Sequence, residues 1–200
     1  GTVDDVAGRL TGIFLAIGAI DWWEILHTHP ASSSVYAATG ANHAVASGRI
    51  SYALGLQGPC VSYDTACSAG LVATHAALRA LQLYECTAGL DIGINVMLTP
   101  SLSLWYAAQG TTSPHGRCHT FDTRADGYAR SEACVTVSLS ATSDRAAKTS
   151  GLALAGSAVR QDGRSASLTA PNGQAQQALL RAARGDTSPS DEATDNGIEA

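Results

Sequence analysis

Charged side chains are scarce in this 200-residue chain. They make up 14% of the residues, while hydrophobic residues make up 45%; a typical soluble domain is roughly one quarter charged. The formal net charge is −5, and Lys and Arg together number 12. The sequence therefore lacks the basic surface on which nucleic-acid binding depends. Low charge with abundant Ala and Gly indicates closely packed elements instead.

Long hydrophobic runs are absent as well. No apolar run approaches the roughly 20 residues that a membrane helix needs. The first residues include Asp4 and Asp5, where a signal peptide would have a basic segment. We therefore expect no membrane partner and an intracellular protein, in the cytoplasm or in a plastid. Gly1 stands where a complete chain would carry Met, so we expect the sequence to be an excerpt.

The cysteines do not form a disulfide framework. Their number is odd and none are spaced as CxxC, a pattern that in a long apolar chain favours free thiols in a reducing compartment. We expect all but one of them to be buried and inert. The five are Cys60, Cys67, Cys86, Cys118 and Cys134.

Metal and nucleotide patterns are also missing. His115, Cys118 and His119 lie close together in the sequence, but no second ligand cluster accompanies them, so we expect no metal. No GxGxxG word occurs, which argues against a bound dinucleotide.

Short apolar runs alternate with helix-like segments along the chain. The apolar runs predict strands at 11–18, 60–63, 89–98, 133–140 and 151–159. Helices are predicted over 42–52, 68–83, 100–108 and 174–184, with a short helix or turn over 21–26. Turn residues predict loops at 27–34, 111–127 and 161–173 and a polar hinge at 142–150. This alternation predicts a layered α/β fold.

Cys67 occupies a position with catalytic potential. It lies between the apolar strand 60–63 and the helix 68–83, which is apolar on most faces and is expected to be buried. The free N–H groups and positive partial charge of a helix start favour the thiolate over the thiol. A sharp strand-to-helix turn would expose the sulfur, and the N–H of Cys67 would help to hold an oxyanion. Acyl transfer to sulfur requires this setting, although a small buried cysteine at a tight turn is the alternative.

Five sequence words carry a family resemblance. Residues 64–73, DTACSAGLVA, resemble the DTACSS-x-LVA active-site signature of β-ketoacyl synthases (ketosynthases), with Ala69 in place of the usual second serine. Residues 48–59, GRISYALGLQGP, are similar to the GR-(L/I)-SY-x-LGLQGP stretch of type I polyketide ketosynthases. Three further words follow in the family's order at 113–122 (SPHGRCHTFD), 126–130 (DGYAR) and 162–172 (DGRSASLTAPN).

The resemblance implies a thiolase-like α/β/α/β/α layered fold, here incomplete. Residues 1–147 would form the N-terminal half, which carries the nucleophile, and residues 148–200 the beginning of the C-terminal half. The full-length protein would be a homodimer, with the strand at 60–63 at the dimer interface.

The resemblance also implies a reaction in polyketide or fatty-acid biosynthesis. An acyl chain would pass from the phosphopantetheine arm of an acyl carrier protein to Cys67, and would then condense with a malonyl-type extender in a decarboxylative Claisen reaction. No permanently bound cofactor is implied. Two alternatives stay open: a non-condensing, ketosynthase-like module that binds carriers, and a thiolase that acts on acyl-CoA.

The sequence departs from the family in two places. The family uses one histidine in an EAHGTGT word and another in a KSNIGH word, and neither word occurs; Glu199 and Ala200 end the chain where the first histidine would follow. We therefore expect this excerpt to lack the catalytic histidines and to be inactive in condensation by itself. Ser131-Glu-Ala133 also replaces the usual GEG, and the lost glycines would shift the local backbone. His75 is expected to be structural, since it lies about 12 Å along the helix from Cys67.

Overall fold

A four-stranded mixed sheet organises the first of the two units into which the chain divides, Gly1–Ser140 and Ala141–Ala200. The computed structural model describes residues 6–30, 34–141 and 152–185. The strands are β1 (Thr11–Ile17), β2 (Cys60–Tyr63), β3 (Ala88–Asn95) and β4 (Ala133–Ser140), in the order β2-β1-β3-β4. β1 is parallel to β2 and β3, while β4 runs antiparallel to β3.

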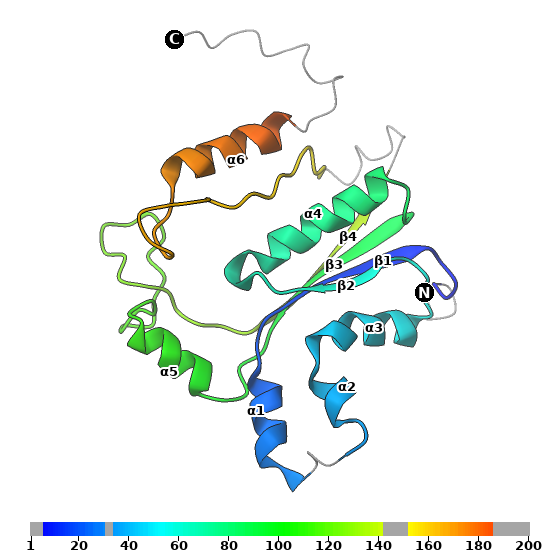
Figure 1. The fold of residues 1–200 in the computed structure, drawn as a ribbon, viewed down its shortest axis with the longest axis horizontal. Helices are drawn as coiled ribbons and strands as arrows, with labels where there is room; N and C mark the ends of the chain where they lie inside the picture. Colours follow the sequence, from blue (N-terminus) through cyan, green and yellow to red (C-terminus); the bar gives the residue numbers. More distant parts are fainter. Residues whose placement is uncertain (1–5, 31–33, 142–151, 186–200) are drawn as a thin grey trace. The chain divides into compact units, whose positions relative to one another are not determined.

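Helices cover both faces of the central strand β1. Phe14 and Ala16 pack against α4 (Ala69–Gln82), whereas Ile13 and Leu15 face α3 (His43–Leu54) on the other side. Figure 1 shows these two helices on opposite faces of the sheet. Burial on both sides explains why β1 reads as a continuous apolar run with no alternation of polar residues.

Small residues allow α4 to approach the sheet closely. Ala69, Ala73, Ala77 and Ala80 form a stripe at helical spacing, and each is at most 6% exposed. The opposite side of α4 is different, since Leu71 is 76% exposed. The expectation that this helix is buried on most faces is therefore wrong within the first unit. Its alanine stripe contacts the sheet, and the side that carries Leu71 does not.

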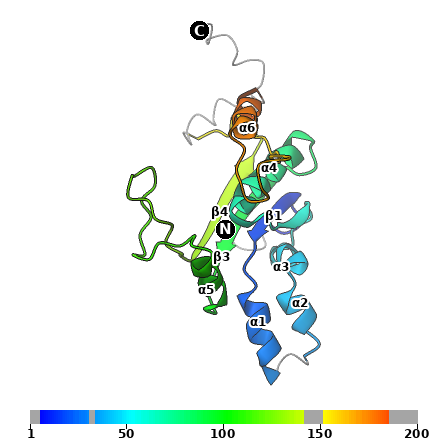
Figure 2. The ribbon, with the colours of Figure 1, turned by 60° about the vertical axis from the view of Figure 1, so that its left-hand side comes forward.

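Buried polar contacts fix the segments that leave the strands. α1 (Asp21–Thr28) follows β1 and α5 (Ser101–Ala108) follows β3. Asp21 is 2% exposed and accepts hydrogen bonds from the backbone N–H groups of Leu98 (2.7 Å) and Thr99 (3.0 Å), so it ties the start of α1 to the segment before α5. α1 lies beside α2 (Ala37–Ala41) in both ribbon views (Figure 2).

The predicted strands at 60–63 and 133–140 are confirmed at both ends, and the predicted helices 42–52, 68–83, 100–108 and 174–184 correspond to α3, α4, α5 and α6 (Gly173–Gly185). In the second unit, the Asn172 side-chain oxygen accepts a hydrogen bond from the N–H of Gln174 at the start of α6. None of the described helices is both long and apolar enough to cross a membrane.

Other element predictions are wrong. Residues 152–160 have no regular secondary structure where a strand at 151–159 was expected, because no strand among the described residues pairs with them. α1 extends to Thr28, into the predicted loop 27–34, and α2 was not predicted. β3 ends at Asn95 instead of residue 98. The expected hinge at 142–150 and the chain end at 186–200 lie outside the described residues.

Asp91 is an acidic residue within the core. It lies on β3, is 7% exposed, and its Oδ2 atom is in contact with the Thr74 hydroxyl of α4, while Oδ1 has no partner among the described residues. The same Thr74 hydroxyl also reaches the carbonyl of Gly70 (2.9 Å), so one proton serves two acceptors. Burial raises the pKa of Asp91, and the bond from Thr74 offsets part of that rise.

The raised pKa of Asp91 means that its contribution to the stability of the fold decreases as the pH rises. A carboxyl whose pKa is higher in the folded state stabilises the fold below its unfolded pKa of about 3.9, and this contribution is lost as the pH rises through the folded value. We therefore expect Asp91→Val to increase the free energy of unfolding by about 1–2 kcal/mol at pH 7, with a smaller gain at pH 4. Thr74 keeps the Gly70 carbonyl as its acceptor. Urea unfolding at the two pH values measures this difference, and equal gains would contradict it.

Candidate active site

Cys67 lies in a tight turn where β2 passes into α4. The turn is a single 3₁₀ segment, Ala66–Ser68, and the Cys67 side chain is exposed. Ala66 has φ of 53°, in the left-handed region that non-glycine residues rarely adopt. The predicted strand-to-helix position of Cys67, with an accessible sulfur, is thus what the structure shows.

Three side chains around Cys67 hold this turn together. The Asp64 Oδ1 atom accepts a hydrogen bond from the N–H of Ala66 (3.1 Å). The Ser68 hydroxyl donates to the Thr65 carbonyl (2.9 Å) and lies 2.9 Å from the Thr65 hydroxyl. These local bonds are one part of the support that a strained backbone conformation needs to persist.

Gly18, which follows β1, makes room for the Asp64 carboxylate. A Cβ atom at Gly18 would lie 2.9 Å from Asp64 Oδ1, closer than side-chain carbons approach oxygen in folded proteins. The end of the central strand and the turn that carries Cys67 are therefore matched in shape.

A pocket of about 720 Å³ opens beside Cys67. It lies at the carboxyl ends of β1 and β3, the edge at which parallel α/β sheets commonly bind ligands. Cys67 and the turn form one wall, and α5 and the segment before β4 form the other. The polar side chains in the lining are Asp64, Cys67, Asn95, Tyr106, Tyr128, Arg130 and Ser131.

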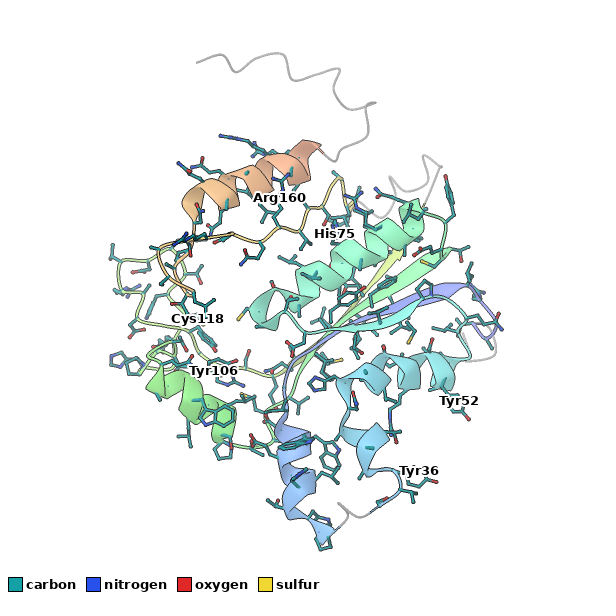
Figure 3. The ribbon with its side chains drawn as sticks, in the orientation of Figure 1. Tyr36, Tyr52, His75, Tyr106, Cys118 and Arg160 are labelled. Carbon is teal, nitrogen blue, oxygen red and sulfur yellow. The ribbon has the colours of Figure 1, made fainter. Side chains whose placement is uncertain are left out.

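The second wall is anchored to its surroundings by backbone contacts. The N–H of Tyr128 donates to the Thr111 carbonyl (3.1 Å), and the N–H of Ala129 donates to Cys118 Sγ (3.1 Å). Asn95, at the end of β3, donates from its side chain to the Ser131 carbonyl (2.6 Å). Figure 3 shows Tyr106 on α5 and Cys118 on the nearby loop. Gly127 permits this approach, since a Cβ there would lie 2.5 Å from the N–H nitrogen of Ser113.

Ser131 and Ala133 replace glycines of the related sequences without strain. Neither residue has a positive φ. Between them, Glu132 accepts a hydrogen bond from the N–H of Met97 (2.7 Å). Both residues thus adopt backbone angles that a residue with a Cβ accepts, and the expected shift relative to sequences with glycine here stays a prediction.

The other thiols differ from the expectation. Cys86 is buried, and burial raises the pKa of its thiol, with the N–H of Gly12 opposing that rise and Glu85 adding to it. Cys60, Cys118 and Cys134 are exposed, so the expectation that all thiols except Cys67 are buried is wrong. Two of them lie on β2 and β4, the outer strands of the sheet, which have a neighbour on one side only.

No histidine of the described residues lines the pocket around Cys67. His75 lies midway along α4, as Figure 3 shows. His115 and His119 belong to the loop before β4, and no three His, Cys, Asp or Glu side chains of the described chain are grouped as metal ligands would be.

Comparisons with known proteins match this arrangement. Residues 1–145 match the family described as the N-terminal domain of β-ketoacyl synthase. Over 180 residues the chain is 41% identical to erythronolide synthase EryA3 of Saccharopolyspora erythraea. The matched region covers 88% of this chain and 6% of that protein. Over 182 residues it is 42% identical to the spectinabilin polyketide synthase system protein NorC of Streptomyces orinoci, covering 89% and 8%.

Solved structures give the same result. The ketosynthase from module 6 of the bacillaene synthase of Bacillus subtilis 168 is similar with a TM-score of 0.76 and 30% identity, over 90% of this chain and 31% of that one. The oxazolomycin ketosynthase domain KS7 of Streptomyces albus JA3453 has a TM-score of 0.76 and 29% identity, over 95% and 34%. The chain thus spans a small part of the synthases and about a third of the ketosynthase structures. These matches show that the chain belongs to the β-ketoacyl synthase family and is a partial ketosynthase domain of the polyketide synthase type, with the thiolase-like α/β fold.

Proposed function

We propose that Cys67 is the acyl-accepting nucleophile of a ketosynthase that receives its substrates from the phosphopantetheine arm of an acyl carrier protein. One observation carries this proposal. The exposed sulfur lies at a supported strand-to-helix turn and faces a pocket at the carboxyl ends of the strands. No permanently bound cofactor is needed, since both substrates arrive covalently attached to the carrier.

The first step is a transfer between two sulfur atoms. The Cys67 thiolate attacks the carbonyl carbon of the carrier thioester, the bond from that carbon to the carrier sulfur breaks, and the carrier thiolate leaves and takes up a proton. We assign one donor for the intermediate oxyanion to the backbone N–H of Cys67. The result is an acyl group on Cys67 and a free carrier arm.

The second step forms the carbon–carbon bond. A malonyl-type extender loses CO₂, the electron pair of the broken bond stays on its α-carbon, and this carbon attacks the thioester carbonyl on Cys67. The Cys67 thiolate is expelled, and the β-ketoacyl product remains on the carrier of the extender. The sequence contains neither histidine word of the family, so we propose that this step needs residues outside this chain.

The outer edge of β2 supports a homodimer of the complete protein. β2 lies at the end of the strand order, and Val61 on it is 40% exposed. An open edge of this kind can pair with another strand. We propose that the β2 edges of two copies meet there, so that the turn carrying Cys67 starts beside the interface.

Thiol reactivity tests the role of Cys67. With limiting iodoacetamide, we expect alkylation of Cys67 before Cys60, Cys118 and Cys134, because exposure is common to the four thiols whereas the helix start is particular to Cys67. Mass spectrometry of the peptides gives the order. Cys134→Ser is the matched control and should leave it unchanged. Uniform labelling of the exposed thiols would contradict an activated Cys67.

Asp64 is a positioning residue, and its hydrogen bond can be tested apart from its charge. Asp64→Ala removes the acceptor for the N–H of Ala66, and we expect acylation of Cys67 by an acyl-carrier thioester to slow by about tenfold. Asp64→Asn keeps the accepting oxygen and should stay close to the unsubstituted rate. If both variants slow the reaction equally, the carboxylate acts through its charge and the positioning role is wrong.

The division of labour between the two steps gives another prediction. The 200-residue chain alone should become acylated at Cys67 by an acyl-carrier thioester, and faster than by the corresponding acyl-CoA. It should not release CO₂ from a malonyl thioester above the rate of Cys67→Ala. Release of labelled CO₂ is the measurement, made on this chain and on a complete ketosynthase domain that contains it. Faster acylation by acyl-CoA would favour a thiolase, and failure of the complete domain to release CO₂ would favour a non-condensing module.

A further inference from the structure

Arg130 is the one basic side chain among the described residues that line the Cys67 pocket. Its backbone is held from both sides, by the contact of Ala129 with Cys118 and by the bond from Asn95 to the carbonyl of Ser131. The guanidinium carbon lies 5.0 Å from the centre of the Tyr106 ring, and Tyr128 meets that ring edge-on at 6.5 Å. The position of the cation is thus fixed by aromatic packing.

The donors of this guanidinium are not used up by the protein. The contact with the Tyr106 ring, at 5.0 Å, is a cation–π contact and takes up none of the N–H donors in a hydrogen bond. Among the described residues, the buried Nε atom has no hydrogen-bond partner, and no carboxylate forms an ion pair with Arg130. A buried donor without a partner is costly and rare, so the unsatisfied Nε–H of Arg130, in the pocket beside Cys67, indicates a ligand for this side chain.

The acidic side chain in the described pocket lining does not neutralise Arg130. Asp64 is the acidic residue of the lining, and its carboxylate is engaged by the N–H of Ala66 and packs against Gly18. A planar guanidinium is matched to carboxylate oxygens, which it can bind with two parallel N–H donors. Among the described residues of the lining, Arg130 is thus the cationic side chain suited to a carboxylate.

We propose that Arg130 binds the free carboxylate of the carboxylated extender and so distinguishes it from uncharged acyl thioesters. This inference rests on the proposed function, because that function brings a carboxylated and an uncharged substrate to the same sulfur. The phosphate of the carrier arm is a second anion, but the whole pantetheine chain separates it from the thioester. The carboxylate lies two carbons from the thioester oxygen and enters the pocket with the reacting group.

The test uses amide analogues in a complete ketosynthase domain that contains this chain. In malonyl-aminopantetheine and acetyl-aminopantetheine an NH group replaces the thioester sulfur, so neither compound can acylate Cys67. Each is prepared with and without the terminal phosphate. Binding is measured as the concentration that halves the rate of Cys67 alkylation by iodoacetamide.

We expect Arg130→Gln to weaken binding of the malonyl analogue by about tenfold or more, with or without the phosphate, and to change binding of the acetyl analogue by less than about twofold. Arg130→Lys keeps the charge but not the fork and should fall between. Arg124→Gln is the matched control, because Arg124 is exposed and paired with Asp122 (2.7 Å) outside the pocket. It should leave binding of both analogues unchanged.

Two results would overturn the proposal. Equal weakening of the malonyl and acetyl analogues in both Arg130 variants would mean that the arginine only supports the pocket wall. A loss that follows the phosphate would assign Arg130 to the carrier arm instead of the carboxylate. Acylation of Cys67 by an acetyl-carrier thioester, measured in the unsubstituted domain, tests the proposed function separately. If Cys67 is not acylated, its assignment as the nucleophile fails. A preference for the malonyl analogue that Arg130→Gln removes would still support the carboxylate site in that case.

Discussion

The packing of β1 between two helices is the constraint on which the candidate site depends. Ile13 and Phe14 point to opposite faces and are both buried, so the strand has no freedom to shift its register without exposing one set of side chains. The alanine stripe of α4 lies directly on this strand, and α4 begins next to the turn of Cys67. The position of the sulfur is therefore set by core packing, and the end of β1, through Gly18, in turn limits where the Asp64 carboxylate can lie.

This dependence explains how a strained residue is kept at the site. Ala66 in the left-handed region costs of order 1 kcal/mol or more, and a local hydrogen bond from its N–H to Asp64 would not by itself hold it against fraying. The turn is clamped instead between β2, which pairs with β1, and α4, which packs on β1. Both ends of the turn are thus anchored on the same strand, and Cys67 lies in the lining of the pocket.

Much of this first wall could be predicted from the sequence, because it is local. The strand at 60–63, the helix after it and the exposed Cys67 between them follow from patterns within about twenty residues. Features that depend on distant partners could not be predicted. Cys60 and Cys134 are exposed because their strands are at the edges of the sheet, and strand order is not visible in either segment. The run at 151–159 has the composition of a strand, yet a strand exists only where a neighbour pairs with it.

The second wall of the pocket could not be predicted from the sequence either. Asn95, Tyr106 and Arg130 come from three separate elements, and only the folded chain brings them together. The sequence words singled out Cys67, whereas DGYAR at 126–130 gave no reason to single out its arginine. Because the two walls are anchored independently, one to β1 through the turn and the other to β3 through Asn95, the second can vary while the sulfur stays in place. If Cys67 carries the acyl group as proposed, substitutions in the second wall would change the accepted substrate and leave the position of the sulfur unaltered.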